Sequence, residues 1–225
     1  MQRTSMVKWT VPAVVVACAG ALLMNDGGPL AAAPAPAVTT AVVDADGRFI
    51  HADWKRGRNV VLNHGCADCH GKGPNPASED YLVGVRDSTQ EFVIGPFKTR
   101  PRNLTPDNLT GLGRFTERQI FNAIRFGLRP GETPDVDITS RTPGEGNFPA
   151  APKYLAPPMP WPAFRHMPDQ DIRDIAAYLK RALRPVRNKV PDSEGPPDFW
   201  ASEYTPDKIG TFPAPDFPTS REHKP

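Results

Sequence analysis

Five consecutive residues, Cys66-Ala67-Asp68-Cys69-His70, constrain this chain more than any other segment of its sequence. The spacing C-x-x-C-H is the pattern by which haem c is attached covalently to proteins. Two thiols three residues apart on one turn can reach the two vinyl groups on one edge of a porphyrin. The histidine that follows is placed beneath the ring, so that its imidazole can bind the iron. The motif therefore predicts one covalent haem c, attached through Cys66 and Cys69, with His70 as an iron ligand.

Other uses of a cysteine pair fit the sequence less well. A structural zinc site needs about four ligands, and the one further cysteine, Cys18, lies near the N-terminus. A thioredoxin-like redox pair is expected in a βαβ context, which the pattern does not indicate. An isolated disulfide between Cys66 and Cys69 would close a very short loop and contribute little stability. Haem attachment is therefore the preferred interpretation.

A second iron ligand is expected from a proline-bracketed methionine. Haem iron in an electron carrier often takes the thioether of Met as its second axial ligand. Met159 lies in the segment Ala156-Pro157-Pro158-Met159-Pro160-Trp161, where the prolines stiffen the backbone and prevent a helix. We therefore expect Met159 to bind the iron, with simple gap-filling as the alternative. Trp161 is expected to pack on the haem edge with its N–H directed to a propionate.

Two residues that follow Met159 in the sequence are less suited to bind the iron. Met167 falls at the start of a predicted helix, whose apolar face it would join. His166 is interpreted as a solvated loop residue.

The N-terminus has the pattern of an export signal. Arg3 and Lys8 precede an uncharged run over residues 9–25, as the charged n-region precedes the apolar h-region of a signal peptide. The run is slightly short for a membrane span. Three cleavage sites fit the sequence: Ala19-Gly20-Ala21, Ala35-Pro36-Ala37 and the lipobox-like Val15-Val16-Ala17-Cys18. Residues 1–37 are therefore predicted to be a signal peptide or N-terminal membrane anchor plus linker. The folded part would face the bacterial periplasm, either free or anchored to the inner membrane.

Composition and periodicity indicate a loop-rich helical protein. The formal net charge of +2 excludes a strongly basic nucleic-acid binder held by phosphate contacts. With 28 prolines and 18 glycines among 225 residues, much of the chain must be loop. Capping residues and apolar spacing predict helices over residues 53–63, 116–127 and 169–184, and no strand pattern is evident. Gly57 in the first helix would permit the close approach of another helix.

The order of these segments resembles the class I cytochrome c fold: helix, C-x-x-C-H, loops, middle helix, proline-bracketed Met and C-terminal helix. More narrowly, several short segments are similar to the domains of cytochrome subunits of membrane-bound alcohol and gluconate dehydrogenases. These segments are Asn103-Leu104-Thr105-Pro106-Asp107, Thr110-Gly111-Leu112-Gly113 with Phe115-Thr116, Met159-Pro160-Trp161 and Ala176-Ala177-Tyr178-Leu179. The resemblance covers about residues 50–190.

The resemblance implies an all-α class I cytochrome c fold over residues 42–190, with long Pro/Gly-rich loops. It also implies electron transfer through covalent haem. Carried over to this chain, Cys66 and Cys69 attach the haem, His70 is the proximal ligand and Met159 is the distal ligand.

Two departures from those subunits affect the prediction. They typically contain three such domains, whereas this chain has one C-x-x-C-H motif, so a mono-haem relative with a different partner is expected. Residues 130–152 are rich in Gly and Pro and resemble a partner-specific insertion.

The resemblance further implies that Gly57 and the region of Tyr178 form the crossing of the first and last helices.

Two arginines and the C-terminal segment complete the predicted domain. Arg100 and Arg102 precede Asn103 and are candidates to neutralise the haem propionates, with solvated surface arginines as the alternative. Residues 191–225 are Pro-rich and contain five interspersed aromatic residues. We expect an extended C-terminal arm that wraps the domain or a partner, and a disordered tail is the alternative.

These observations predict a periplasmic mono-haem c-type cytochrome that transfers single electrons between redox proteins and is not itself an enzyme. Expected partners are a membrane-bound dehydrogenase, an oxidase or a photosynthetic complex, and no nucleic acid. One alternative is an integral electron-transfer subunit of a larger membrane oxidoreductase, respiratory or photosynthetic complex. The other is a haem enzyme or sensor with an open sixth site, which requires that Met159 does not bind iron.

Overall fold

The computed structural model describes residues 42–86 and 90–224. The segment predicted to carry the signal peptide or membrane anchor, residues 1–37, lies outside the described residues. Within the described part of the chain, no helix has both the length and the apolar character needed to cross a membrane.

Two helices far apart in the sequence cross at a glycine. α1 (Trp54–Asn63) begins after Asp53, whose carboxylate accepts hydrogen bonds from two backbone N–H groups of the first turn. α1 meets α5 (Asp169–Ala177) at Gly57, where a Cβ atom would lie 1.9 Å from the Asp174 carbonyl oxygen. The predictions of a helix over residues 53–63 and of a close approach at its glycine are therefore confirmed.

The C-terminal helix changes its winding before it ends. The sequence predicts one helix over residues 169–184, whereas the structure continues α5 as a five-residue π-helix, η3 (Tyr178–Ala182). The contact with Gly57 lies at Asp174, about one turn before the Tyr178 region that the resemblance implies. Tyr178 is nevertheless buried in the same hydrophobic cluster as α1 and α5.

The middle helix has the ends that its sequence predicts. α3 (Glu117–Phe126) begins with a capping box: the Thr116 hydroxyl oxygen accepts from the Gln119 N–H, and the Gln119 side-chain oxygen accepts from the Thr116 N–H, both at 3.1 Å. Its Ile120 and Ile124 side chains join the buried cluster. The helix predicted over residues 116–127 is therefore confirmed.

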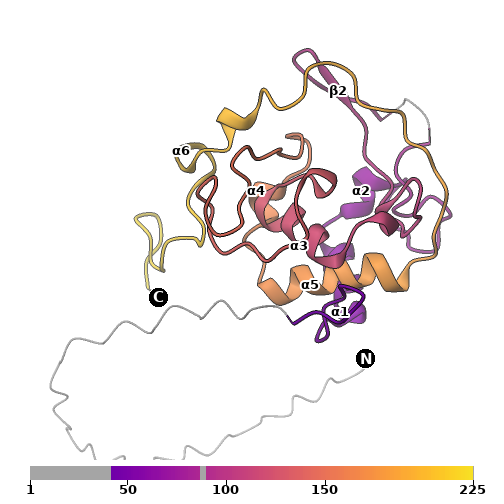
Figure 1. Cartoon of the computed structure of the whole chain (residues 1–225), viewed down its shortest axis with the longest axis horizontal. Helices are drawn as coiled ribbons and strands as arrows, with labels where there is room; N and C mark the ends of the chain where they lie inside the picture. The colour runs from indigo at the N-terminus through magenta and orange to yellow at the C-terminus, as the bar shows by residue number, and fades with distance from the viewer. Residues whose placement is uncertain (1–41, 87–89, 225) are drawn as a thin grey trace, which may run out of the picture. The chain divides into compact units, whose positions relative to one another are not determined.

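Short helical turns complete the helical part and lie mainly in the loops. They are α2 (Cys66–His70), η1 (Leu112–Arg114), η2 (Pro130–Glu132), α4 (Trp161–Phe164), η4 (Ala201–Glu203) and α6 (Pro206–Ile209). Figure 1 shows α1, α2, α3, α4 and α5 grouped together and joined by long loops.

A β-hairpin corrects the predicted fold class. β1 (Phe92–Ile94) pairs antiparallel with β2 (Phe97–Thr99), with Phe92 opposite Thr99. The prediction of an all-α class I cytochrome c fold is therefore wrong. Strands of three residues are too short to show an alternating pattern in the sequence. Their pairing depends on a two-residue loop and on a third segment: the Lys98 N–H donates to the Glu194 carbonyl at 2.9 Å.

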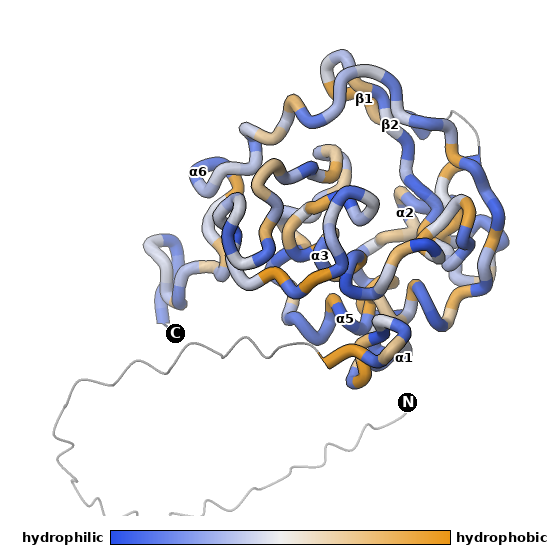
Figure 2. Tube along the Cα trace, in the orientation of Figure 1, coloured by the Kyte–Doolittle hydropathy of each residue, from blue (hydrophilic) through white to orange (hydrophobic). Residues whose placement is uncertain are grey.

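The C-terminal segment follows the outside of its own domain. Figure 1 traces it from the end of η3 past β2 to α6, and Figure 2 shows it largely in hydrophilic and pale colours. Trp200 anchors it beside Phe97, with ring centroids 4.9 Å apart, and is only 2% exposed. Farther along, the Arg165 guanidinium donates to the Ile209 carbonyl at 2.7 Å. The segment therefore packs on the domain as an arm.

Candidate haem-binding site

Both cysteines of the motif lie on one short helix. α1 ends at Asn63, and Gly65 has a φ of +62°, a left-handed conformation that turns the chain into α2. Cys66 and Cys69 are therefore presented one turn apart, half-buried and not joined in a disulfide. Burial raises the pKa of the Cys66 thiol to about 11, so this group is a neutral thiol at neutral pH.

His70 has one ring nitrogen engaged and the other free to bind a metal. Its Nδ1 atom lies 2.8 Å from the Arg102 carbonyl oxygen. Because a carbonyl can only accept, Nδ1 carries the proton and donates it, which leaves the lone pair on Nε2. Burial lowers the pKa of His70, while the bond to Arg102 opposes this shift. A neutral imidazole held by a backbone carbonyl is the usual form of a histidine ligand.

The loop that supplies this carbonyl is fixed by buried polar side chains. The Asn103 side-chain oxygen accepts from the Thr105 N–H at 2.9 Å, and its amide nitrogen donates to the Val186 carbonyl at 2.8 Å. Both Asn103 and Thr105 are buried. Leu104 also donates its N–H to the Leu82 carbonyl at 2.9 Å. The segment Asn103 to Asp107 carried the family resemblance, but the hydrogen bond between His70 and the preceding Arg102 carbonyl is visible only in the structure.

Met159 sits in a tight turn of the proline-rich segment. Its N–H donates to the Ala156 carbonyl at 3.0 Å, and its own carbonyl accepts from the Trp161 N–H at 2.8 Å. The Met159 side chain is half-buried. These two bonds fix the backbone on both sides of the thioether.

Trp161 anchors this segment between two tyrosines. Its ring lies parallel to Tyr154 at a centroid distance of 5.9 Å and edge-on to Tyr204 of the arm at 4.9 Å. The indole is 3% exposed. Burial raises the pKa of both tyrosines. The arm therefore contributes directly to the packing next to Met159, a contact that the sequence does not reveal.

The structure brings α2 and α4 to one core. Ala67 of α2 belongs to the same buried cluster as Ile120 and Ile124, and Cys66 and Phe164 pack against it. The His64 and Phe164 rings, which lie just before α2 and at the end of α4, are 5.6 Å apart and edge-on. The helix that carries His70 and the helix that follows Met159 thus meet the same apolar cluster.

The two alternative ligand candidates lie where the sequence predicts. Met167 packs against the hydrophobic cluster, and His166 is exposed. Both interpretations are therefore confirmed.

The predicted propionate partners both contact the C-terminal arm. Arg102 donates to the Pro191 carbonyl at 3.0 Å and to the Ser193 hydroxyl at 2.8 Å. Arg100 is buried, pairs with Glu91 and donates to the Asp192 carbonyl at 2.9 Å. The structure therefore reveals a function of these arginines in holding the arm.

The donor set fits a covalent haem. It combines two unpaired thiols on one turn with an imidazole whose Nε2 is free, and the proline-rich segment adds a thioether. Among the described residues, no group of three or more His, Cys, Asp and Glu side chains is placed to hold a metal ion.

Comparisons with known proteins support the resemblance. No protein-family model matches the chain. The chain is 26% identical over 180 residues to the gluconate 2-dehydrogenase cytochrome c subunit of Pantoea cypripedii, which covers 76% of this chain and 34% of that protein. It is 29% identical over 180 residues to the alcohol dehydrogenase (quinone) cytochrome c subunit of Gluconacetobacter polyoxogenes, with 76% and 32% covered.

A third relative is a diheme cytochrome c-type protein of Cereibacter sphaeroides, 27% identical over 126 residues, with 55% of this chain and 34% of that protein covered. The matched region spans about a third of the length of these curated relatives. Their names describe cytochromes or cytochrome subunits, in agreement with the prediction of a non-enzyme component. The resemblance predicted from the sequence is thus confirmed: this chain is similar to the cytochrome c subunits of gluconate and alcohol dehydrogenases.

Proposed function

We propose that this chain is a mono-haem c-type cytochrome of the bacterial periplasm that passes single electrons between redox proteins. Cys66 and Cys69 would attach the haem, and His70 and Met159 would bind its iron. The observation that carries this proposal is the hydrogen bond from His70 Nδ1 to the Arg102 carbonyl at 2.8 Å. It leaves Nε2 unprotonated within a C-x-x-C-H motif, which suits an axial ligand.

When bound, haem c supplies an iron that cycles between Fe(III) and Fe(II) without bond chemistry on a substrate. The chain's own residues would hold the cofactor and shield it from water. Ala67 and Cys66 take part in apolar packing beside the attachment point. The buried loop around Asn103 holds the Arg102 carbonyl, and this carbonyl keeps the His70 proton on Nδ1.

Met159 is proposed as the second ligand because its backbone is already ordered. The bonds to Ala156 and from Trp161 fix its main chain, and the flanking prolines limit other conformations. An ordered loop loses less conformational entropy when its side chain binds a metal. The packing of Trp161 against Tyr204 would stabilise the same position.

The partner is proposed to be a redox protein such as a membrane-bound dehydrogenase. This rests on the names of the relatives, which are cytochrome c subunits of gluconate 2-dehydrogenase and alcohol dehydrogenase (quinone). A single C-x-x-C-H motif favours one haem. The charged and apolar pattern of residues 1–25 favours export to the periplasm. The names of the relatives also favour a second candidate, a fixed subunit of a larger oxidoreductase.

The test is an optical spectrum of the purified exported protein, oxidised and reduced, with and without carbon monoxide. We expect one haem per chain, low-spin bands, a weak sulfur-to-iron charge-transfer band and no reaction with carbon monoxide. Met159→Ala should lose the charge-transfer band and bind carbon monoxide. Met167→Ala is the matched control, because this methionine packs in the core, and it should keep both properties.

Two results would contradict the proposal. A high-spin wild-type protein that binds carbon monoxide readily would favour a haem enzyme or sensor with an open sixth site. A Met159→Ala protein that retains the charge-transfer band would show that another residue supplies the sulfur.

A further inference from the structure

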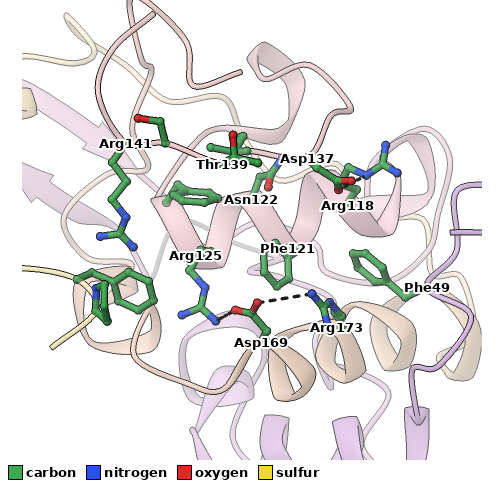
Figure 3. A pocket seen from close by; sticks show the side chains of 15 residues that line it. Phe49, Arg118, Phe121, Asn122, Arg125, Asp137, Thr139, Arg141, Asp169 and Arg173 are labelled. Atoms are coloured by element: carbon green, nitrogen blue, oxygen red, sulfur yellow. Dashed lines mark hydrogen bonds and ion pairs between the residues drawn. The ribbon is translucent and has the colours of Figure 1, made fainter. Parts of the chain in front are cut away.

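A cavity lies beside α3, on the face of the helix away from Ile120 and Ile124. Its volume is about 450 Å³, and it is bounded by α3, the loop 137–141, the start of α5 and the arm. Its lining includes none of the residues proposed to bind haem. Figure 3 shows Arg118, Asn122 and Arg125 along α3, with Arg141 on the opposite loop. A cavity of this size can hold a small organic molecule.

Aromatic rings form much of the wall. Phe49 and Phe121 lie edge-on with centroids 6.0 Å apart, and the other two lining rings are Phe126 and Phe212. Flat apolar faces of this kind favour a planar apolar ligand. The cavity therefore combines an aromatic wall with several guanidinium groups.

Most of these guanidinium groups have an acidic neighbour. Arg118 pairs with Asp137 at 3.0 Å, and Arg125 forms an ion pair with Asp169. Arg173 lies 3.5 Å from the same Asp169 carboxylate. The positive charges at this wall are thus largely offset by two carboxylates, which Figure 3 shows beside their partners.

Arg141 differs from the other three arginines that line the cavity. Among the described residues it has no hydrogen bond or ion pair; its guanidinium stacks on Phe212 at 3.7 Å and lies 5.8 Å from Phe126. Arg125 approaches the same Phe212 ring, at 4.7 Å. Two cations therefore lie close to one aromatic ring, and of these two only Arg125 has a counter-charge among the described residues.

The environment of Arg141 favours the binding of an anion next to its guanidinium group. The side chain is half-buried, and burial, with Arg165 and Arg125 nearby, lowers its pKa to about 10. Arg141 is still protonated at neutral pH, because that pKa lies well above 7. A bound anion would replace lost hydration and reduce the repulsion between the neighbouring cations.

We propose that this cavity binds a small aromatic carboxylate, with Arg141 as the residue that holds the carboxylate group. The planar guanidinium matches a carboxylate with two parallel hydrogen bonds, which a lysine cannot reproduce. The phenylalanine rings would contact the aromatic body of the ligand. The cavity is formed in part by the segment 130–152 and by the arm, so the ligand would bind where these two segments meet α3.

The experiment is a calorimetric titration of the full-length protein with benzoate, and with benzamide as a neutral molecule of similar shape. We expect saturable benzoate binding that is at least tenfold tighter than benzamide binding. Arg141→Gln should weaken benzoate binding at least tenfold, and Arg141→Lys should weaken it by less. Arg221→Gln, which removes an exposed arginine of the arm, should leave it unchanged.

Several results would overturn the proposal: no saturable benzoate binding, equal binding of benzamide, or unchanged affinity in Arg141→Gln. Inorganic phosphate that binds as tightly as benzoate would overturn the carboxylate assignment. The thermal midpoint of each variant shows whether it is folded, and the charge-preserving Arg141→Lys keeps the test decisive if Arg141→Gln unfolds. The assay measures binding and not electron transfer, so its result is independent of the haem proposal.

Discussion

The helix crossing and the C-terminal arm are held in place by different interactions. α1 and α5 meet mainly through buried backbone and apolar side chains, with Gly57 against the Asp174 carbonyl, and an ion pair between Arg56 and Asp174 also joins them. The arm has few regular elements and is held by arginines of the domain that donate to its carbonyl groups. These bonds run from Arg100 to Asp192, from Arg102 to Pro191, and from Arg165 to Ile209, Gly210 and Thr211.

This difference explains why the sequence predicts where the two helices lie, whereas for the C-terminal arm it predicts only an extended segment and not the groups that hold it. Burial of a helix face requires a repeating apolar pattern, which can be read from the chain. A guanidinium bound to a carbonyl requires no pattern in the segment that supplies the carbonyl. We therefore expect the crossing to unfold with the whole domain and the arm to open locally.

The largest loss of stability is expected from a substitution at the crossing of α1 and α5. Gly57→Ala places a Cβ atom 1.9 Å from the Asp174 carbonyl oxygen, so α1 and α5 must separate. We expect the free energy of unfolding to fall by about 3 kcal/mol, measured by urea denaturation. Gly131→Ala is the control, because its Cβ would meet only the Phe115 ring at an ordinary 3.6 Å. Equal stability of the two variants would show that the helices separate at little cost.

A smaller change in the stability of the whole domain is expected when the arm loses its aromatic anchor. Trp200→Ala removes a buried ring that packs on Phe97. We expect a loss of about 3 kcal/mol confined to the arm, seen as faster amide hydrogen exchange over residues 191–211, with a smaller change in the urea midpoint than for Gly57→Ala. Phe199→Ala is the matched control, because Phe199 is 46% exposed.

The comparison would fail if Trp200→Ala lowered the urea midpoint as much as Gly57→Ala. In that case the arm and the helix crossing would form one cooperative unit. Faster exchange confined to the arm would instead support two regions of different stability.

The smallest effect on the free energy of unfolding is expected from Asp107, in the loop that positions His70. This effect depends on pH. Asp107 accepts hydrogen bonds from the Thr110 hydroxyl at 2.8 Å and N–H at 2.7 Å, and these bonds lower the pKa of its carboxyl group. A lowered pKa means that the folded protein binds this proton less tightly than the unfolded chain. The stabilisation is therefore complete above the unfolded pKa of about 3.9 and is lost as pH falls through the folded value.

This pH dependence is tested by comparing wild type with Asp107→Asn. The difference in their free energies of unfolding should be constant from pH 7 to about pH 5 and should shrink below about pH 4. Other carboxyl groups titrate in both proteins and cancel in the difference. A difference that stays constant down to pH 2.5 would contradict the assigned hydrogen bonds.

Local signals predicted the helical elements and the candidate ligands. Asp53 and Thr116 cap their helices as expected, because capping involves residues two or three positions apart. The hairpin at residues 92–99 was missed, because its strands are short and its second strand pairs with Glu194, almost a hundred positions away. A single sequence carries no signal for that pairing.

Long-range polar contacts were also missed. The Glu117 carboxylate is almost fully buried, accepts from the Phe49 N–H at 2.8 Å and pairs with Arg181 at 2.5 Å. In the sequence, Glu117 is only the second residue of the helix predicted over residues 116–127. Its burial depends on two segments that fold against that turn from both ends of the domain.

The sequence by itself determined the C-x-x-C-H motif, the helix caps and the proline-bracketed Met159, because each depends on neighbouring residues. Only the tertiary structure decided which carbonyl holds His70 and where Arg100 and Arg102 point. It also decided the unbalanced charge of Arg141 beside Phe212. These features join groups separated by tens of residues. Burial and charge balance at such sites depend on how the whole chain folds and not on the order of neighbouring residues.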